Sequence, residues 1–315
     1  MPDSSDLLLD LPLSWARTSV STPSLRTLRL PLSRLMWIPR ADIPIHWHFE
    51  TIFADTLRSQ PHGFVLQGCN EALARYILAQ GGEAAHVGIE AVIDLQHHMA
   101  KPSLLALARR GLRWGTVQPI GHDDALLQRL TDFRRQTVHH GKPQLQYAFR
   151  TTYEPSMQGF AFVGADQSWL GAITLSQMRP GYWHTELLLR RKNARVGVME
   201  ALILAVMTRL RAQNASWMSL GTAPFLTTRD ALRSRACRHP WSLSCRNDWI
   251  MRLGRWLRFG YDYRGLYQFK NKFGPEWRPL YLCGWPTLPW RILPDLSYSS
   301  RYLHLLGYQM IHWFS

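Results

Sequence analysis

Two lysines separated by a single residue, Lys270 and Lys272, are the most distinctive chemical feature of this sequence. The chain contains only five lysines against thirty-two arginines. Arginine suits planar bidentate pairing, whereas a lysine ammonium is a compact, mobile point charge on a slim stem. On a strand the two side chains would share one face, and on a loop they could converge on one phosphate or one developing oxyanion. The pair therefore predicts a site that meets negative charge.

Glu186 is the second candidate, in the segment HTELLLRR that precedes a long apolar helix. A carboxylate at this place could act as a general base, or it could hold the amine of an amino-acid substrate. Composition alone supports a surface or salt-bridged glutamate equally well. The hypothesis that unites the candidates is that Glu186, Lys270 and Lys272 open onto one shared cavity.

Gly197 begins that apolar helix, directly after the basic run RRKNARV. A helix N-terminus with flanking arginines is suited to binding an anion. Acyltransferases that use acyl-CoA cradle its pyrophosphate with a Gln/Arg-x-x-Gly-x-Gly/Ala loop, and here Ala194 and Met199 stand where the first residue and the second glycine are required. The sequence therefore argues against coenzyme A as the donor, and a plain helix start remains an equal interpretation of Gly197.

The charge of the chain points to a polyanionic partner. The net charge is +15 at pH 7, and residues 229–278 hold twelve Lys and Arg against four Asp and Glu. Such a patch favours nucleic acid or anionic lipid as the partner. Arg258 and Arg264 alternate there with Trp and Tyr, which suit stacking on unpaired bases or contact with headgroups. The alternative is an ordinary basic helix packed on the core.

Several function classes find no support in the sequence. The four cysteines form no CxxC pair, and the histidine pairs lack the spacing of a metal site. The N-terminus is unlike a secretory signal, and no run of about 18 apolar residues predicts a membrane-spanning helix. Walker loops, nucleophile elbows and dinucleotide fingerprints are also missing. We therefore expect a cytoplasmic protein with no metal and no cofactor.

Apolar periodicity and turn residues predict an α+β protein. The second half shows three strands, the helix from Gly197 and a further strand, which is the order of the Gcn5-related acyltransferase (GNAT) core. The first half shows a fainter version of it. Strands are expected at the start of 63–82 and within 84–98, 159–166, 169–178, 182–190 and 216–225, and helices at the end of 63–82, within 103–115 and 123–138, and from 197.

We therefore expect tandem GNAT-like subdomains with mixed central sheets flanked by helices. The N-terminal subdomain covers residues 43–122, and the C-terminal one covers 123–315 with the basic segment and an aromatic tail. Residues 1–42 are expected to form a leader of loose, uncertain structure with room for one short strand. The tail YLHLLGYQMIHWFS suits either an interfacial anchor or a last element packed on the core.

The stretch LYQFKNKFGPEWRPLYL, residues 266–282, resembles the C-terminal signature of the aminoacyl-phosphatidylglycerol synthases, the multiple peptide resistance factor family, which includes the phosphatidylglycerol lysyltransferases. VGIEAVIDL, GVMEALI, MSLGTAPF and LPWRILPDL are similar to further segments of that family in the same order. The resemblance covers roughly residues 85–295. It includes Gly221 and Thr222 in the MSLGTAPF turn and Trp277 in the signature.

The resemblance implies an enzyme that moves a lysyl or alanyl group from aminoacyl-tRNA to a hydroxyl of phosphatidylglycerol or a related acceptor. By similarity, Lys270 and Lys272 would neutralise phosphate or transition-state charge, and Glu186 would orient the donor amine or the acceptor hydroxyl. It also implies peripheral contact with anionic phospholipid on the inner face of the plasma membrane, and a role in antimicrobial peptide resistance. The expected substrate-binding residues are Arg190, Gly197, Gly221, Thr222, Arg258, Arg264 and Trp277.

Two residues depart from the family pattern. Leu280 stands where the family has an arginine, and Leu189 stands where the family's DLMR segment has its arginine, with Arg190 one place later. Two other functions therefore stay open: an N-acyltransferase that uses acyl-CoA, and a non-catalytic protein that binds RNA or anionic membrane. The amino acid, the acceptor and the oligomeric state are also left open.

Overall fold

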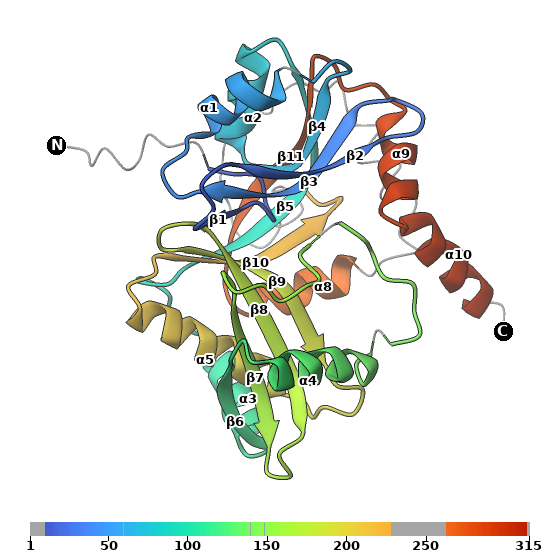
Figure 1. Ribbon diagram of the computed structural model, residues 1–315. Helices are drawn as coiled ribbons and strands as arrows, with labels where there is room; N and C mark the ends of the chain where they lie inside the picture. The colour runs from blue at the N-terminus through green and yellow to red at the C-terminus, as the bar shows by residue number, and fades with distance from the viewer. Residues whose placement is uncertain (1–9, 59, 139, 148, 228–262, 314–315) are drawn as a thin grey trace.

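The computed structural model describes residues 10–58, 60–138, 140–147, 149–227 and 263–313. It has the α+β class that the sequence predicts (Figure 1). The strands are β1 (Ala16–Thr18), β2 (Ser24–Arg29), β3 (Met36–Pro44), β4 (Phe64–Cys69), β5 (Glu83–Asp94), β6 (Gly115–Ile120), β7 (Gln158–Gly164), β8 (Trp169–Arg179), β9 (Tyr182–Arg190), β10 (Trp217–Pro224) and β11 (Glu276–Trp285). The helices are α1 (Phe49–Ile52), α2 (Glu71–Ala79), α3 (Pro102–Leu112), α4 (Asp124–Arg135), α5 (Val198–Ala212), α8 (Tyr263–Asn271), α9 (Ile292–Ser299) and α10 (Tyr302–Trp313).

All the strands join one mixed sheet. Their order is β1-β3-β4-β11-β5-β10-β9-β8-β7-β6, with β2 pairing β3 from outside this path. Strands β6 to β9 form an antiparallel meander, α5 follows, and β10 returns parallel to β9. The strand–strand–strand–helix–strand order predicted for the second half is therefore confirmed.

Helices cover both faces of the sheet. At the β6–β10 end, α3, α5 and α8 pack on one face, and α4 packs on the other. At the β1–β4 end, α1 and α2 share a core with one face, and α9 packs on the opposite face. This two-sided burial follows from strands such as β7 and β8, whose residues are apolar on both faces.

The expectation of a loose leader over residues 1–42 is wrong for the part that the structure describes. Strands β1, β2 and most of β3 lie in that segment, and β1 and β3 are joined to the sheet by parallel pairing. Trp15 and Trp37 are fully buried there. The weak periodicity of this segment arises because β3 is largely buried on both faces and so shows little alternation of polar and apolar residues.

Strand β11 ties the end of the chain to its beginning. It lies between β4 and β5 and is antiparallel to both, with Cys283 opposite Leu66 on one side and Ala84 on the other. The subdomain boundary expected at residue 122 assigns β11 to the C-terminal half. The segment that carries Lys270 and Lys272 thus continues into β11, whose two neighbours, β4 and β5, belong to the N-terminal half.

The pairing of β9 with β10 ends early. The ladder consists of three pairs, the last of which joins His184 to Ser219. Strand β10 also has a register irregularity against β5 after Ser219. Gly221 lies in this irregularity with a φ of +82°, a conformation that favours glycine. Beyond His184 and Ser219 the two strands therefore continue without pairing each other.

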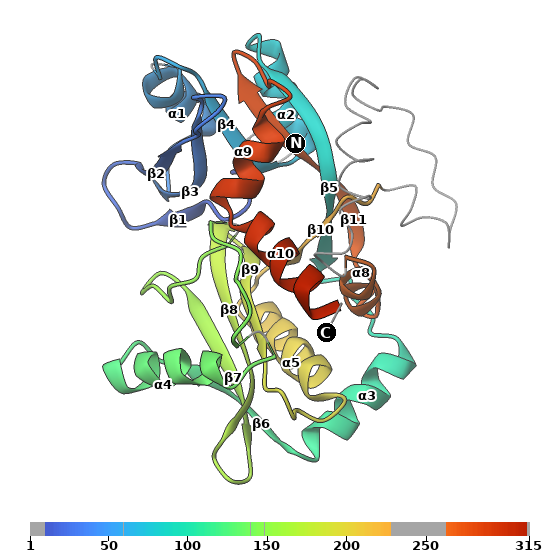
Figure 2. The ribbon, with the colours of Figure 1, turned by 90° about the vertical axis from the view of Figure 1, so that its right-hand side faces the viewer.

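Helices α3 and α5 approach each other through glycine. A Cβ on Gly111 would lie 2.2 Å from the carbonyl oxygen of Gly197, and a Cβ on Gly197 would lie 2.2 Å from the carbonyl oxygen of Leu107. Figure 2 shows α3 beside the start of α5 at the edge of the molecule. Gly197 therefore has a packing role at the beginning of α5, in addition to any contact with a ligand.

Replacing Gly111 with alanine should destabilise the protein by about 2 kcal/mol, because the new methyl group meets backbone atoms that cannot move aside. Gly307, in α10, has no atom within 4 Å of its Cβ position, so Gly307→Ala should be neutral or stabilising by up to about 1 kcal/mol. Urea unfolding of both variants measures the difference. Equal stabilities would contradict the close helix contact.

Candidate functional site

Strand β9 carries buried polar side chains at every second position: Tyr182, His184 and Glu186. Tyr182 and His184 are two residues apart and so point to the same side of the sheet. Glu186 lies at an irregularity of β9, where Thr174 of β8 pairs with Leu187 and Leu175 pairs with Thr185, and its side chain is bonded to Ser176, the β8 residue that pairs with His184. Trp183, between them, packs in the core under α5 on the other side. Buried polar groups need partners, and the partners of this row define the candidate site.

The carboxylate of Glu186 is held by three donors and one nearby charge. The Ser176 hydroxyl donates to Oε1 at 2.6 Å, and the backbone N–H of Arg150 donates to Oε2 at 2.7 Å. The Ser14 hydroxyl donates to Oε2 across a longer distance of 3.4 Å. Nε of Arg150 lies 3.9 Å from Oε1. The carboxylate is therefore buried beside Arg150, and its longest hydrogen bond is the one from Ser14.

Arg150 links Glu186 to the N-terminal strands. Its guanidinium is fully buried and donates to the carbonyl oxygens of Ser14 and Ala41. It also forms ion pairs with Asp42, at 2.9 Å, and Glu154. A loop arginine thus fixes the candidate carboxylate to a segment far away in the sequence.

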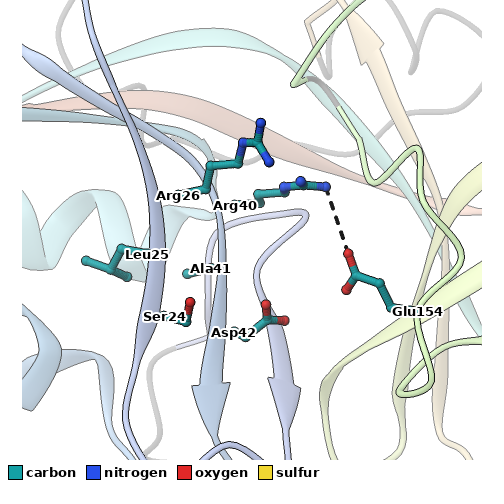
Figure 3. Close-up of a pocket in the computed structure, with 7 residues that line it drawn as sticks. All are labelled: Ser24, Leu25, Arg26, Arg40, Ala41, Asp42 and Glu154. Atoms are coloured by element: carbon teal, nitrogen blue, oxygen red, sulfur yellow. Dashed lines mark ion pairs between the residues drawn. The ribbon is translucent and has the colours of Figure 1, made fainter.

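A surface hollow of about 340 Å³ borders this ion-pair network, since Asp42 and Glu154 line it (Figure 3). Arg40 crosses it toward Glu154, with 4.0 Å between Nη1 and Oε1. A second hollow lies beside α4. Neither Glu186 nor Lys270 lines either of them. The first is lined by Ser24, Leu25, Arg26, Arg40, Ala41, Asp42 and Glu154.

Glu90, on β5, forms a second buried anionic group near the row. It is opposite Thr222 on β10 and Arg278 on β11, and it accepts a hydrogen bond from the hydroxyl of Tyr182 at 3.2 Å. Burial raises the pKa of Glu90 above its usual range. Burial, with Glu90 beside it, also raises the pKa of Tyr182. Glu90 and Tyr182 therefore form a buried hydrogen-bonded pair at the Tyr182 end of the row.

Lys270 reaches the point where β9 and β10 separate. Its Nζ donates to the carbonyl oxygen of Thr222 at 2.8 Å and lies 3.5 Å from where a Cβ of Gly221 would be. The ring of His184 is 3.8 Å from the same position. His184 also contacts the hydroxyl of Ser219 at 3.2 Å, and that hydroxyl accepts the N–H of Gly221. One amine, one imidazole and one hydroxyl therefore meet at the separation.

The environment of Lys270 makes its proton labile. The side chain is buried, which lowers its pKa from 10.5 to about 7, although the negative charge of Glu90 acts in the opposite direction. An amine with this pKa is present in both protonation states near neutral pH. Lys270 can therefore donate a hydrogen bond as an ammonium and accept a proton as an amine.

The two lysines do not converge. The sequence suggested a strand or a loop for them. For Lys270 this is wrong, because it lies in helix α8, whereas Lys272 lies in the turn that follows the helix. Residues two apart in a helical turn point in different directions. Lys272 follows the helix and forms an ion pair with Glu200 at 2.8 Å, with its Nζ over the ring of Phe269. Lys272 therefore neutralises a carboxylate at the start of α5.

Other expected residues are divided between this site and the surface. Gly221 and Thr222 lie directly beside Lys270. Trp277 stacks on Tyr267 with 4.8 Å between the ring centres. Arg190 is exposed at the far end of β9 and turns back to the carbonyl oxygen of Ala194. Arg264 is exposed on α8, and Arg258 lies outside the described residues.

Sequence reasoning missed several members of the site: Glu90, Tyr182, His184 and Arg150. Two patterns could have found the first three. Glu90 interrupts the apolar run VGIEAVID, and YWHTE places a polar group at every second position of a strand that is otherwise buried. Arg150 lies in a loop, and nothing in its sequence neighbourhood distinguishes it from the other arginines.

The two departures from the family pattern lie in apolar surroundings. Leu280 packs in a small core with Leu13, Val92, Met178 and Tyr182. Leu189 packs in the core under α4. A leucine is therefore well accommodated at each place.

Within the described ranges, no cluster of three or more His, Cys, Asp or Glu side chains could hold a metal ion. No helix of the described chain is long and apolar enough to cross a bilayer.

The fold and this site define an α+β protein whose central sheet opens between two parallel strands next to buried acidic and basic groups. The chain belongs to the phosphatidylglycerol lysyltransferase C-terminal family, whose sequence model matches residues 49–284. The family resemblance of the sequence is therefore confirmed. No curated protein matches the chain.

Two solved structures share the fold. L-PGS from Bacillus licheniformis superposes with a TM-score of 0.63 at 15% identity, covering 91% of this chain and 86% of that one. The C-terminal domain of a putative lysylphosphatidylglycerol synthetase from Agrobacterium fabrum superposes with a TM-score of 0.60 at 19% identity, covering 84% of this chain and 81% of that one. At these identities the likeness establishes the fold.

The stability of the protein should report the titration of Lys270. The folded-state pKa of about 7 lies below the ordinary value of 10.5, so between these values the folded chain binds fewer protons than the unfolded chain. Its free energy of unfolding therefore rises with pH in this window. Between pH 7 and pH 9 the free energy of unfolding of the wild type should rise by about 2 kcal/mol more than that of Lys270→Met.

Urea unfolding at the two pH values measures this gain, with Lys142→Met as the matched control at an exposed lysine. The control should follow the wild type at both values. Parallel behaviour of the wild type and Lys270→Met would show that the amine is not desolvated.

Proposed function

We propose that this protein is an aminoacyltransferase that moves an aminoacyl group, lysyl or alanyl, from aminoacyl-tRNA to a hydroxyl of phosphatidylglycerol or a related lipid. The observation that carries the proposal is the buried amine of Lys270 at the separation of β9 and β10, in a chain of this family. An aminoacyl ester is already activated, so its transfer needs positioning, a proton acceptor and charge stabilisation.

In this proposal the acceptor hydroxyl attacks the carbonyl carbon of the aminoacyl ester. Its proton passes to the neutral amine of Lys270, and the resulting ammonium stabilises the tetrahedral oxyanion. The bond to the ribose oxygen of the tRNA then breaks, and that oxygen takes the proton back from Lys270. Atoms and charges balance without a metal, a cofactor or a covalent intermediate on the protein.

Glu186 is assigned to the α-ammonium group of the aminoacyl donor. It lies two residues along β9 from His184, and its carboxylate is bonded to Ser176, the β8 residue that pairs with His184. Its hydrogen bonds to Ser176 and to the backbone of Arg150 fix the direction of the carboxylate. The longer contact with Ser14 is the one that an ammonium would replace. His184, bonded to Ser219, is assigned to orienting the reacting groups.

The remaining predicted residues support the substrates. Gly221 and Thr222 are assigned to the backbone that lies beside Lys270. The tRNA acceptor end is assigned to stacking on Trp277 and to phosphate contacts with Arg258 and Arg264. Lys272 and Gly197 are assigned to ordering the start of α5. Arg190, exposed at the end of β9, is assigned to binding phosphate. The reaction would take place at the inner face of the plasma membrane, where lipid aminoacylation lowers negative charge and so supports peptide resistance.

The direct test is transfer of label into lipid. The purified protein is incubated with phosphatidylglycerol vesicles and with tRNA charged with radiolabelled lysine or alanine, and the organic phase is counted. Label should enter the lipid with at least one of the two, and RNase treatment of the charged tRNA beforehand should abolish it. Transfer that survives RNase, or transfer from acyl-CoA in its place, would overturn the tRNA-donor proposal.

The role of Lys270 has its own test. Lys270→Met should lower kcat by about 100-fold, as expected for loss of a transition-state donor and proton carrier, while KM for the charged tRNA changes little. Lys142→Met, at an exposed lysine far along the chain, is the matched control and should retain full activity. Equal rates for the wild type and Lys270→Met would remove Lys270 from the mechanism.

A further inference from the structure

The outer face of α3 carries apolar side chains that the protein leaves in water. Met99, just before the helix, is 90% exposed, and Leu112 at its end is 52% exposed. Leu105 and Trp114 are also exposed. The inner face of the same helix packs Leu104 and Ala108 into the core, so the exposed residues are surplus to the packing of the helix.

A neighbouring segment extends this surface. Arg195 lies over the ring of Trp114, with 4.9 Å between its Cζ and the ring centre. Val196, next to it, is 55% exposed. The close contact of Gly111 with Gly197 holds α3 and this segment together. We call this surface the α3 face; its apolar members are Met99, Leu105, Leu112, Trp114 and Val196.

The charges of the α3 face are all of one sign. Residues 95–122 contain Lys101, Arg109, Arg110 and Arg113 and no Asp or Glu. Residues 187–199 contain four further basic residues and again no acidic one. Arg109 and Arg110 of α3, and Arg113 directly after it, are exposed. A helix with exposed apolar side chains among cations suits the interface of a bilayer that contains anionic lipid.

We propose that the α3 face is the surface by which this protein docks on an anionic phospholipid bilayer. The arginines meet lipid phosphates, and the apolar side chains enter the boundary between headgroups and acyl chains. RNA also attracts cations, but its recognition uses cations, hydrogen bonds and stacking on aromatic side chains, so it gives no reason for a group of exposed Met, Leu and Val side chains. The bilayer is therefore the occupant that the surface favours.

The position of the face connects it to the site. The amine of Lys101 donates to the carbonyl oxygen of Asn271, the last residue of α8, and His98 contacts the carbonyl oxygen of Phe273. The start of α3 is thus attached to the element that carries Lys270. Figure 2 shows α3 on the outside of the molecule below α8. Docking through α3 would place the bilayer next to this end of α8, which deepens the proposed function by naming how the lipid is met.

Co-sedimentation with vesicles tests the proposal without any turnover. Vesicles of phosphatidylcholine mixed with phosphatidylglycerol are compared with vesicles of phosphatidylcholine alone, at physiological salt. The wild type should bind the mixed vesicles more tightly. The triple variant Arg109→Gln, Arg110→Gln, Arg113→Gln should lose about tenfold or more in vesicle affinity, together with the preference for the anionic lipid.

The apolar contribution separates a bilayer from RNA. The double variant Leu105→Ser, Leu112→Ser should bind mixed vesicles about tenfold more weakly while it binds uncharged tRNA as the wild type does. The matched control is Leu32→Ser, Ile45→Ser, at two exposed positions elsewhere, which should leave vesicle binding unchanged. Unchanged vesicle binding by the α3 double variant overturns the proposal, and loss of tRNA binding alone by the charge variant assigns the face to RNA.

Activity with dispersed lipid keeps this inference separate from the proposed function. With phosphatidylglycerol in detergent micelles, both α3 variants should transfer label as the wild type does, since no bilayer has to be found. Absence of transfer by the wild type would contradict the proposed function and leave the vesicle result standing. Transfer lost in micelles by the α3 variants alone would place α3 in the substrate site and overturn the docking role.

Discussion

The end of the ladder between β9 and β10 at His184 and Ser219 is the constraint on which the rest of the site depends. Two adjacent parallel strands that stop pairing leave backbone groups and side chains in the interior of a sheet without their usual partners. The irregularity at Gly221 creates this opening, and Lys270 donates to the carbonyl oxygen that follows it. The ring of His184 and the amine of Lys270 both lie beside this stretch of β10.

Two contacts between distant parts of the chain fix the side chains around the separation of β9 and β10. Arg150 joins Glu186 to the strands of the N-terminal segment, and α8 brings Lys270 from beyond β10. The strand that follows α8 then enters the sheet between β4 and β5. The site is therefore assembled by segments from the beginning, the middle and the end of the chain. This explains why β1 to β3 are integral to the structure although the family match begins only at residue 49.

Charge is distributed differently inside and outside the molecule. Inside, each buried acidic group of the site has a specific donor, as Glu186 has Ser176 and Glu90 has Tyr182. Outside, the α3 face bears cations without acidic neighbours in its sequence. The inner arrangement fixes geometry, whereas the outer one attracts a polyanion from a distance. Leu189 and Leu280, the two departures from the family pattern expected from the sequence, both lie in apolar cores.

The sequence by itself determined the class of the fold, the order of strands and helix around α5, and the family, because hydrophobic periodicity and a long local motif are properties of neighbouring residues. It also singled out Glu186, Lys270, Gly221 and Thr222. The tertiary structure alone decided that Lys270 and Lys272 face different partners, since this depends on whether residues 263–271 are helical or extended. It also decided that Arg150 and Glu90 belong to the site, because contacts between residues far apart in the chain follow from strand order and register, which local patterns do not encode.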